Sequence, residues 1–165
     1  LLFAPWMFGE RSPIDDHHVR GGYFNLSLAH TKAHMVRAVL EGVALHVRWM
    51  MEGVEKRKML GQVDAVNMIG GCANSDLWPQ IIADVLKKPI RRVARPVEAG
   101  TVGASLIALV GLGEVPDFGA ASRLVKIERT FEPNPDNFSV YDRLFTLLKD
   151  YYRRNKPLWR RINRE

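Results

Sequence analysis

The chain has 165 residues, of which 47% are apolar and 25% are charged, the balance of one soluble globular domain with a sizeable core. No run approaches the ~18–20 apolar residues of a membrane span. The first residues have neither the basic start nor the small-residue cleavage site of a signal peptide. We therefore expect no membrane partner.

The net charge of +6 is concentrated at the C-terminus, because residues 151–165 hold six basic residues and one acidic residue. A surface built for nucleic acid spreads its charge over a folded face and interleaves it with reading groups. The pattern favours a solvated helix end over a contact with a polyanion, and we expect no nucleic-acid partner.

One cysteine, Cys72, occurs in the chain. It cannot form an internal disulfide, which favours a reducing compartment and predicts a cytoplasmic protein. Because the sequence begins without Met, we expect it to be an internal piece of a longer protein.

The first predicted elements are a short strand and a long helix. Residues 1–28 are turn-rich, with a strand near Tyr23–Leu26. A helix is predicted over His30–Lys56, where apolar residues recur at the three-and-four spacing of one buried stripe. That stripe comprises Met35, Ala38, Val39, Gly42, Val43, His46, Trp49 and Met50.

A strand–helix–strand unit follows. Asp64–Ile69 is predicted as a short buried strand that ends at two glycines. Ser75 is a suitable cap for the next helix, and a second strand is predicted over Pro89–Ala94. The inward residues of that helix are expected to be Leu77, Trp78, Ile81, Ile82, Val85 and Leu86.

The remaining elements are a small-residue helix over Thr101–Val110, a loop over 114–136 with a strand near Val125–Phe131, and an amphipathic helix over Asn137–Arg154. Alternation of strands and helices predicts parallel strands in an α/β fold. Two such strands are too few for a complete nucleotide-binding sheet. We therefore expect missing upstream strands, an exposed sheet edge and self-association into a homo-oligomer.

The most informative local feature is the run GGCANS at residues 70–75, between a strand end and a helix start. Adjacent glycines let backbone approach a ligand without an intervening Cβ, and the amides of the following helix turn favour phosphate or a polar base edge. Ser75 either caps the helix or bonds an adenine edge. On the local pattern alone, a plain tight turn is favoured over a ligand-binding turn.

A second small-residue run, EAGTVGA at residues 98–104, opens the next helix. Its residues favour close packing on the sheet over direct contact with a ligand. His30 and His34 have a metal-compatible spacing without a third ligand, so a helix-surface role is predicted. Cys72 is expected to be a small core residue rather than a reactive thiol.

The run DDHH at residues 15–18 is predicted to be a hydrophilic loop. Glu10 and Arg11 fit either a buried ion pair or a contact at a domain interface. Nothing in the chain specifies a general base, so neither a catalytic residue nor a metal ligand is predicted.

Together these segments resemble the FGGY family of carbohydrate kinases over nearly the whole chain. Residues 21–26 (GGYFNL) and 34–41 (HMVRAVLE) are similar to the family's second signature. Asn25 stands where the family usually has glycine, and asparagine tolerates the left-handed backbone that such a turn needs.

Further segments support the resemblance. Residues 3–6 (FAPW) and 9–13 (GERSP) look like those of xylulokinase-type members. Residues 70–75 (GGCANS), followed by WPQ and AD, resemble the family's adenosine motif, and Gly103-Ala104 resembles the start of its next helix.

The resemblance implies a ribonuclease-H-like fold of the actin and hexokinase type, here an incomplete α/β domain with helices packed on a small parallel sheet. It implies ATP and Mg²⁺ bound in a cleft between two domains. Gly70 and Gly71 would then line the ribose and α-phosphate, with Ser75 at the adenine edge and Asn74 close by.

By the same resemblance, residues 1–165 are part of the C-terminal, nucleotide-binding domain. The N-terminal sugar-binding domain is absent, and the Asp that accepts the proton of the sugar hydroxyl lies N-terminal to this portion. We therefore expect the chain alone to be inactive. The parent is expected to transfer the γ-phosphate of ATP to a sugar hydroxyl, with a ketopentose such as xylulose as the acceptor.

A non-catalytic interaction or assembly module derived from a kinase domain is the alternative. Residues 70–75 keep the pattern of the family's nucleotide motif, which favours the enzyme. A third class, a nucleic-acid-binding domain, rests only on the basic tail.

Overall fold

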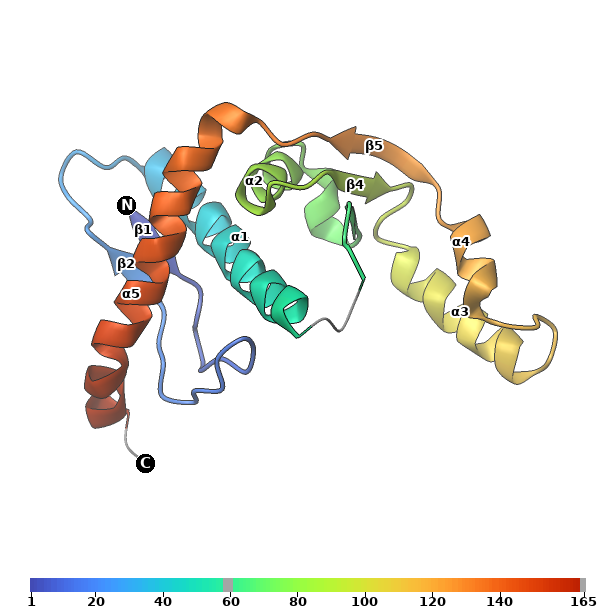
Figure 1. The fold of residues 1–165 in the computed structure, drawn as a ribbon, viewed down its shortest axis with the longest axis horizontal. Helices are drawn as coiled ribbons and strands as arrows, with labels where there is room; N and C mark the ends of the chain where they lie inside the picture. The colour runs from blue at the N-terminus through green and yellow to red at the C-terminus, as the bar shows by residue number, and fades with distance from the viewer. Residues whose placement is uncertain (58–60, 164–165) are drawn as a thin grey trace. The chain divides into compact units, whose positions relative to one another are not determined.

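The computed structural model describes residues 1–57 and 61–163, and its elements are drawn in Figure 1. The chain divides into two compact units. Unit 1 comprises Leu1–Val63, Asp84–Lys87 and Asn134–Glu165, and unit 2 comprises Asp64–Ala83 and Lys88–Pro133. None of the helices in the described part of the chain is long and apolar enough to span a membrane.

Unit 1 combines a two-stranded antiparallel sheet with two long helices (Figure 1). β1 (Leu2–Ala4) pairs with β2 (Gly22–Phe24), so that Phe3 lies opposite Tyr23. Asn25, which follows β2, adopts a left-handed backbone with φ of 64°. The expectation that asparagine supports this turn is confirmed.

α1 (Lys32–Lys56) is the first of the long helices. The Thr31 N–H donates to Nδ1 of His34 at 3.1 Å, one half of a capping box. A Cβ added at Gly42 would lie 2.3 Å from the carbonyl oxygen of Phe3. Glycine at this position therefore allows α1 to approach β1 closely.

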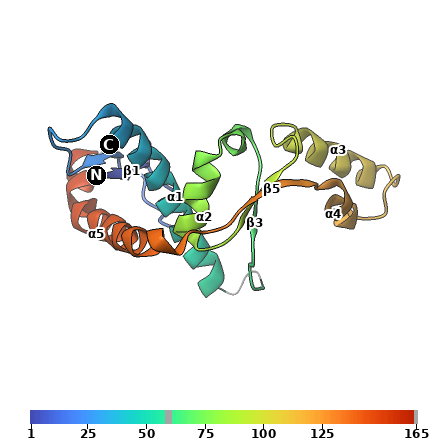
Figure 2. The same cartoon turned by 90° about the horizontal axis from the view of Figure 1, so that it is seen from above.

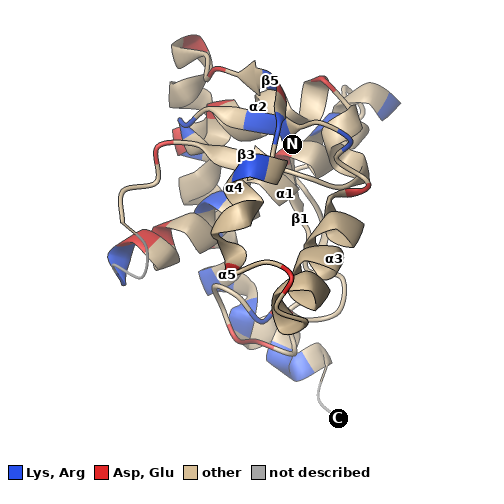
Figure 3. Ribbon diagram, turned by 90° about the vertical axis from the view of Figure 1, so that its right-hand side faces the viewer, with Lys and Arg blue, Asp and Glu red and all other residues tan. Residues whose placement is uncertain are grey.

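α5 (Phe138–Ile162) is the second long helix, and it buries Tyr141, Phe145, Leu148, Tyr152 and Trp159. Its basic residues occupy the remaining face, and Figure 3 shows several of them on the turns that lead to the C-terminus. The helix continues through Pro157, whose ring removes one helix hydrogen bond. The expected solvated helix end is thus only partly correct, because Trp159 is 8% exposed.

Trp6 is the centre of the core of unit 1, with no exposed surface. Its ring lies 5.8 Å from that of Trp159 and 5.7 Å from that of Tyr152, both in edge-to-face geometry. It also lies 6.4 Å from the ring of Trp49 on α1. Edge-to-face aromatic pairs add about 0.5–1.5 kcal/mol each to the burial of their surfaces. Trp6 therefore joins α1 and α5 in one aromatic cluster.

Unit 2 contains a mixed three-stranded sheet in the order β3-β4-β5. β3 (Val66–Met68) and β4 (Ile90–Val93) are parallel, while β5 (Ile127–Phe131) pairs with β4 in the antiparallel direction. The chain passes from β3 to β4 through a short 3-10 turn (Gly71–Asn74) and α2 (Leu77–Leu86).

Two helices of unit 2 lie side by side beyond the strands (Figure 2). They are α3 (Ala99–Gly111) and the short α4 (Ala121–Leu124). α3 leaves several apolar side chains exposed, and β3 and β5 are the edges of the described sheet. Self-association through such surfaces remains a prediction.

The predicted elements correspond to α1, β2, β3, α2, β4, α3, β5 and α5. The parallel pair is confirmed, but the sheet is mixed because β5 is antiparallel. Three predictions of burial were wrong: Leu77 is 50% exposed, Cys72 is exposed, and the strand expected to be buried over Asp64–Ile69 is at most half-buried, with Ile69 54% exposed. Sequence reasoning also missed β1, α4 and the last two turns of α5.

Candidate functional site

The glycine turn of residues 70–75 follows β3 after one intervening residue, Ile69. Gly70 has φ of 83°, a region that side chains other than glycine rarely enter. Its N–H donates to the carbonyl of Pro96 at 2.7 Å, and its carbonyl accepts from the N–H of Ala73 at 3.1 Å. Ala73 is fully buried. One side of the turn is therefore anchored in unit 2.

The opposite side of the turn is open. A Cβ built on Gly71 would meet no atom within 4 Å, and the same holds for Gly70. Packing within the described chain does not require glycine at position 71. The backbone of the turn is therefore accessible at Gly71, as it is at other glycines of the chain such as Gly53 and Gly103.

The polar residues of the turn are accessible. Gly71, Asn74 and Ser75 are exposed, and Gly70 is half-buried. The Ser75 hydroxyl oxygen accepts from the N–H of Trp78 at 3.4 Å, so the expected helix-capping role is confirmed. A serine hydroxyl also carries one proton that it can donate. Capping α2 therefore leaves Ser75 able to donate to a ring nitrogen of a base.

The path from the glycines to α2 differs from the expected one. A 3-10 turn of four residues separates Gly70 from α2, and Ser75 already binds the amide of Trp78. The first turn of α2 therefore does not directly adjoin the glycines. The surface available to a ligand is the turn itself.

A cavity of about 550 Å³ lies between the ends of β3 and β4 and helices α3 and α4. Ile69, which precedes the glycine turn, lines it together with Ala99, Val102 and Gly103 of α3. A Cβ at Gly100 or Gly103 would meet no atom within 4 Å. Close packing of these small residues was expected, and it is not found within residues 1–57 and 61–163.

Two arginines hold the residue that follows the turn. Arg92 of β4 and Arg129 of β5 donate to the two carboxylate oxygens of Asp76, at 2.8 and 2.7 Å. The hydrogen bond from Arg92, and then the charges of both arginines, hold the pKa of the Asp76 carboxyl below its ordinary value. Sequence reasoning missed this cluster, because nothing in the local pattern marks Arg92.

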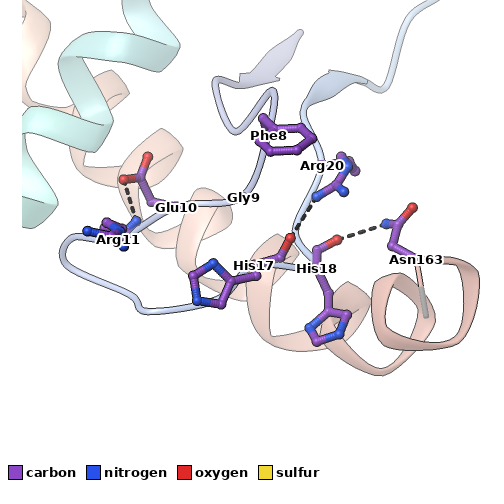
Figure 4. A pocket seen from close by; sticks show the side chains of 8 residues that line it. All are labelled: Phe8, Gly9, Glu10, Arg11, His17, His18, Arg20 and Asn163. Atoms are coloured by element: carbon purple, nitrogen blue, oxygen red, sulfur yellow. Dashed lines mark hydrogen bonds between the residues drawn. The ribbon is translucent and has the colours of Figure 1, made fainter. Parts of the chain in front are cut away.

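A larger hollow of about 920 Å³ lies in unit 1, far along the chain from the glycine turn (Figure 4). In Figure 4 the rings of His17 and His18 and the guanidinium of Arg11 point in different directions rather than toward one centre. Arg20 donates to the carbonyl of His17 at 2.8 Å. The hollow is lined by Phe8, Gly9, Glu10, Arg11, His17, His18, Arg20 and Asn163.

Glu10 bonds to a buried histidine. Its Oε2 lies 3.1 Å from Nε2 of His46, and its Oε1 accepts from the N–H of Arg11 at 2.8 Å. Trp6 donates to Nδ1 of His46 at 3.2 Å, so neutral His46 carries its proton on Nε2. Glu10 and Arg11 were expected to form a buried ion pair or to lie at a domain interface. The ion pair is wrong, because the carboxylate of Glu10 pairs with His46 instead.

His46 is expected to make the stability of unit 1 depend on pH. Burial lowers the pKa of His46, against the opposing charge of Glu10. Because the unfolded state then binds the proton more readily, the unfolding free energy falls as pH decreases through about 6.5. Urea unfolding between pH 5 and 8 measures this slope. His46→Gln is expected to flatten it, and an unchanged slope would refute the assignment.

Other residues considered from sequence have structural roles. His30 accepts through Nδ1 from the N–H of Ser27 at 3.0 Å, and His34 caps α1. Asp16, expected in a hydrophilic loop, is 5% exposed and accepts from the hydroxyl of Tyr152 at 3.0 Å. No three His, Cys, Asp or Glu residues gather into a metal-binding group within the described ranges.

Residues 1–112 match the sequence profile of the C-terminal domain of the FGGY family of carbohydrate kinases. The chain is 31% identical over 160 residues to a xylulose kinase of Staphylococcus epidermidis, covering 96% of this chain and 32% of that protein. It is 31% identical over 148 residues to a gluconokinase of Bacillus subtilis, covering 90% and 28%. The chain thus spans about a third of the length of these curated relatives.

Solved structures give the same result for the fold. A ligand-bound xylulose kinase of Lactobacillus acidophilus superposes with a TM-score of 0.83 at 28% identity, covering 99% of this chain and 33% of that one. A glycerol kinase of Plasmodium falciparum with ADP superposes with a TM-score of 0.72 at 16% identity, covering 91% and 30%. The expected fold class, part of an actin- and hexokinase-like ATPase domain, is confirmed.

Proposed function

The chain belongs to the FGGY family of carbohydrate kinases, and from this membership we propose that it supplies the nucleotide-binding part of an ATP-dependent sugar kinase. The chain covers about a third of its relatives. The proposed full-length kinase therefore includes an N-terminal domain that holds the sugar and the catalytic base, and residues 1–165 alone are inactive.

The glycine turn carries the proposal within this chain. Gly71 has open space where a side chain would be, and it lies at the carboxyl end of a parallel strand, where α/β folds place their ligands. Gly70 and Gly71 are proposed to meet the ribose and α-phosphate of ATP, and Ser75 to donate to the adenine edge beside Asn74. The open space beside position 71 leaves room for the nucleotide against the backbone of the turn.

Bound ATP would supply the phosphoryl group, and Mg²⁺ would neutralise its charge. We place no magnesium ligand in this chain. The residues of the glycine turn bind and orient the nucleoside. This helps to align the phosphoryl group with the acceptor hydroxyl, on which phosphoryl transfer depends.

The proposed acceptor is a ketopentose such as xylulose. Xylulose kinases occur among both the sequence relatives and the similar structures. A gluconokinase matches at the same identity as the first xylulose kinase, so a screen of acceptors must include gluconate.

Calorimetric titration of the full-length kinase with Mg·ATP tests the proposal. Ser75→Trp is expected to abolish binding, because the indole would fill the surface assigned to adenine. Ser139→Trp is the matched control, since Ser139 is exposed on α5 in unit 1; this variant should bind as the unaltered protein does.

Two results would contradict the proposal. Equal binding by Ser75→Trp and Ser139→Trp would move the adenosine site away from residues 70–75. Absence of ATP binding in the unaltered full-length protein would favour the alternative, an assembly module derived from a kinase domain.

A further inference from the structure

Arg92 connects the glycine turn to the sheet of unit 2. Its Nη1 donates to the carbonyl of Ala73 at 3.2 Å and to Oδ1 of Asp76 at 2.8 Å. Ala73 and Asp76 flank Asn74 and Ser75 in the sequence. One guanidinium therefore ties both sides of the segment that carries the two polar residues assigned to adenosine.

The guanidinium of Arg92 is itself held firmly. Only 12% of its side chain is exposed, and its Nη2 lies 3.3 Å from the carboxylate of Glu128. Its carbon Cζ lies 5.5 Å from the centre of the Phe131 ring. Hydrogen bonds from a charged, shielded donor are stronger than those between exposed groups. The outer contact of Asp76 with Arg129 is weaker support, because both side chains are more than half exposed.

The other contacts in the outer part of the turn are long. The Ser75 hydroxyl oxygen accepts from the N–H of Trp78 at 3.4 Å. The N–H of Ser75 reaches the carbonyl of Cys72 at 3.4 Å, which is long for a hydrogen bond. The backbone of Gly71 has open space beside it. Without Arg92, residues 73–76 would lose their strongest link to β4.

We propose that Arg92 is a positioning residue for nucleotide binding, which fixes the backbone of residues 73–76 so that Asn74 and Ser75 meet the adenosine. This inference rests on the function proposed above. Arg92 does not touch the nucleotide; it acts through the carbonyl of Ala73 and the carboxylate of Asp76.

Arg91 provides a matched control. It precedes Arg92 on β4, and successive residues of a strand point to opposite faces of the sheet. The side chain of Arg91 is exposed. Arg91→Met and Arg92→Met therefore remove the same charge from the same strand, but only Arg92→Met releases the turn.

The test uses the full-length kinase with its preferred sugar. Arg92→Met is expected to raise the KM for ATP and the calorimetric Kd for Mg·ATP about tenfold, the loss of roughly one hydrogen bond to a charged group. The KM for the sugar and kcat should change less than twofold. Arg91→Met should leave all four quantities unchanged, and a merely structural role would alter both KM values together.

A second variant covers the case in which Arg92→Met does not fold. Asp76→Asn keeps the shape of an exposed side chain and removes the charge that holds Arg92, so it should raise the KM for ATP in the same selective way. An unaltered KM for ATP in both variants would overturn the role of Arg92. Failure of the unaltered kinase to bind ATP would instead overturn the proposed function, and this inference with it.

Discussion

Replacing Gly71 with leucine is expected to weaken the binding of Mg·ATP by the full-length kinase at least about 100-fold, an effect comparable to overfilling a close-packed site. The leucine side chain would project into the open space beside the turn, where the nucleotide is proposed to lie. The folded protein has room for this side chain, so the melting temperature without ligand should hardly change. Calorimetric titration measures the affinity, and differential scanning calorimetry measures the stability.

Gly53→Leu is the control for this substitution. Gly53 lies in α1, and a Cβ there also meets no atom within 4 Å. Leucine favours a helix more than glycine does, so this variant should retain both its fold and its ATP affinity. If Gly71→Leu binds Mg·ATP as tightly as Gly53→Leu, the open space at position 71 has no connection with the nucleotide.

Trp6→Ala is expected to destabilise unit 1 by about 3–5 kcal/mol, the usual cost of removing a fully buried aromatic side chain. The variant would open a cavity among Trp49, Tyr152 and Trp159. It would also leave Nδ1 of His46 without its donor, which adds the cost of an unsatisfied buried group. Hydrogen exchange at the amides of α1 and α5 measures the loss as reduced protection.

Two further variants separate the loss of the buried ring from the loss of the hydrogen bond to His46 and from the effect of removing an exposed aromatic side chain. Trp6→Phe keeps an aromatic ring and removes the N–H, so it should cost less than Trp6→Ala. Phe8→Ala removes an aromatic residue that is 90% exposed, and surface changes of this kind usually cost little. Equal protection in Trp6→Ala and Phe8→Ala would contradict the central place of Trp6 in the core.

Local pattern predicted those elements whose stability depends on residues near in sequence. The three-and-four spacing identified α1 and α2, and the glycines marked the end of β3. β1 was missed because it has only three residues and exists through pairing with Gly22–Phe24. The end of α5 was missed because the run of basic residues suggested a solvated helix end, whereas Trp159 is buried in the aromatic cluster.

The candidate site likewise combines residues that the local sequence marks with residues that only the fold brings together. Two glycines after a strand are visible in the sequence, and the structure places Gly70, Gly71, Asn74 and Ser75 in one turn. Arg92 was not predicted, because its partners Ala73 and Asp76 lie 19 and 16 residues earlier. Only the pairing of β3 with β4 brings them together. Cys72 was predicted to be a small core residue because no histidine partner for a reactive thiol is specified, but in the 3-10 turn it is exposed.

The exposure of Cys72 makes the turn accessible to site-specific labelling. Cys72 is the single cysteine of the sequence, it is exposed, and it directly follows Gly71. A maleimide fluorophore therefore attaches to this chain at one known position, and its emission reports on the surroundings of the turn in real time. Residues 1–165 thus carry their own attachment point for an optical sensor, without any introduced cysteine.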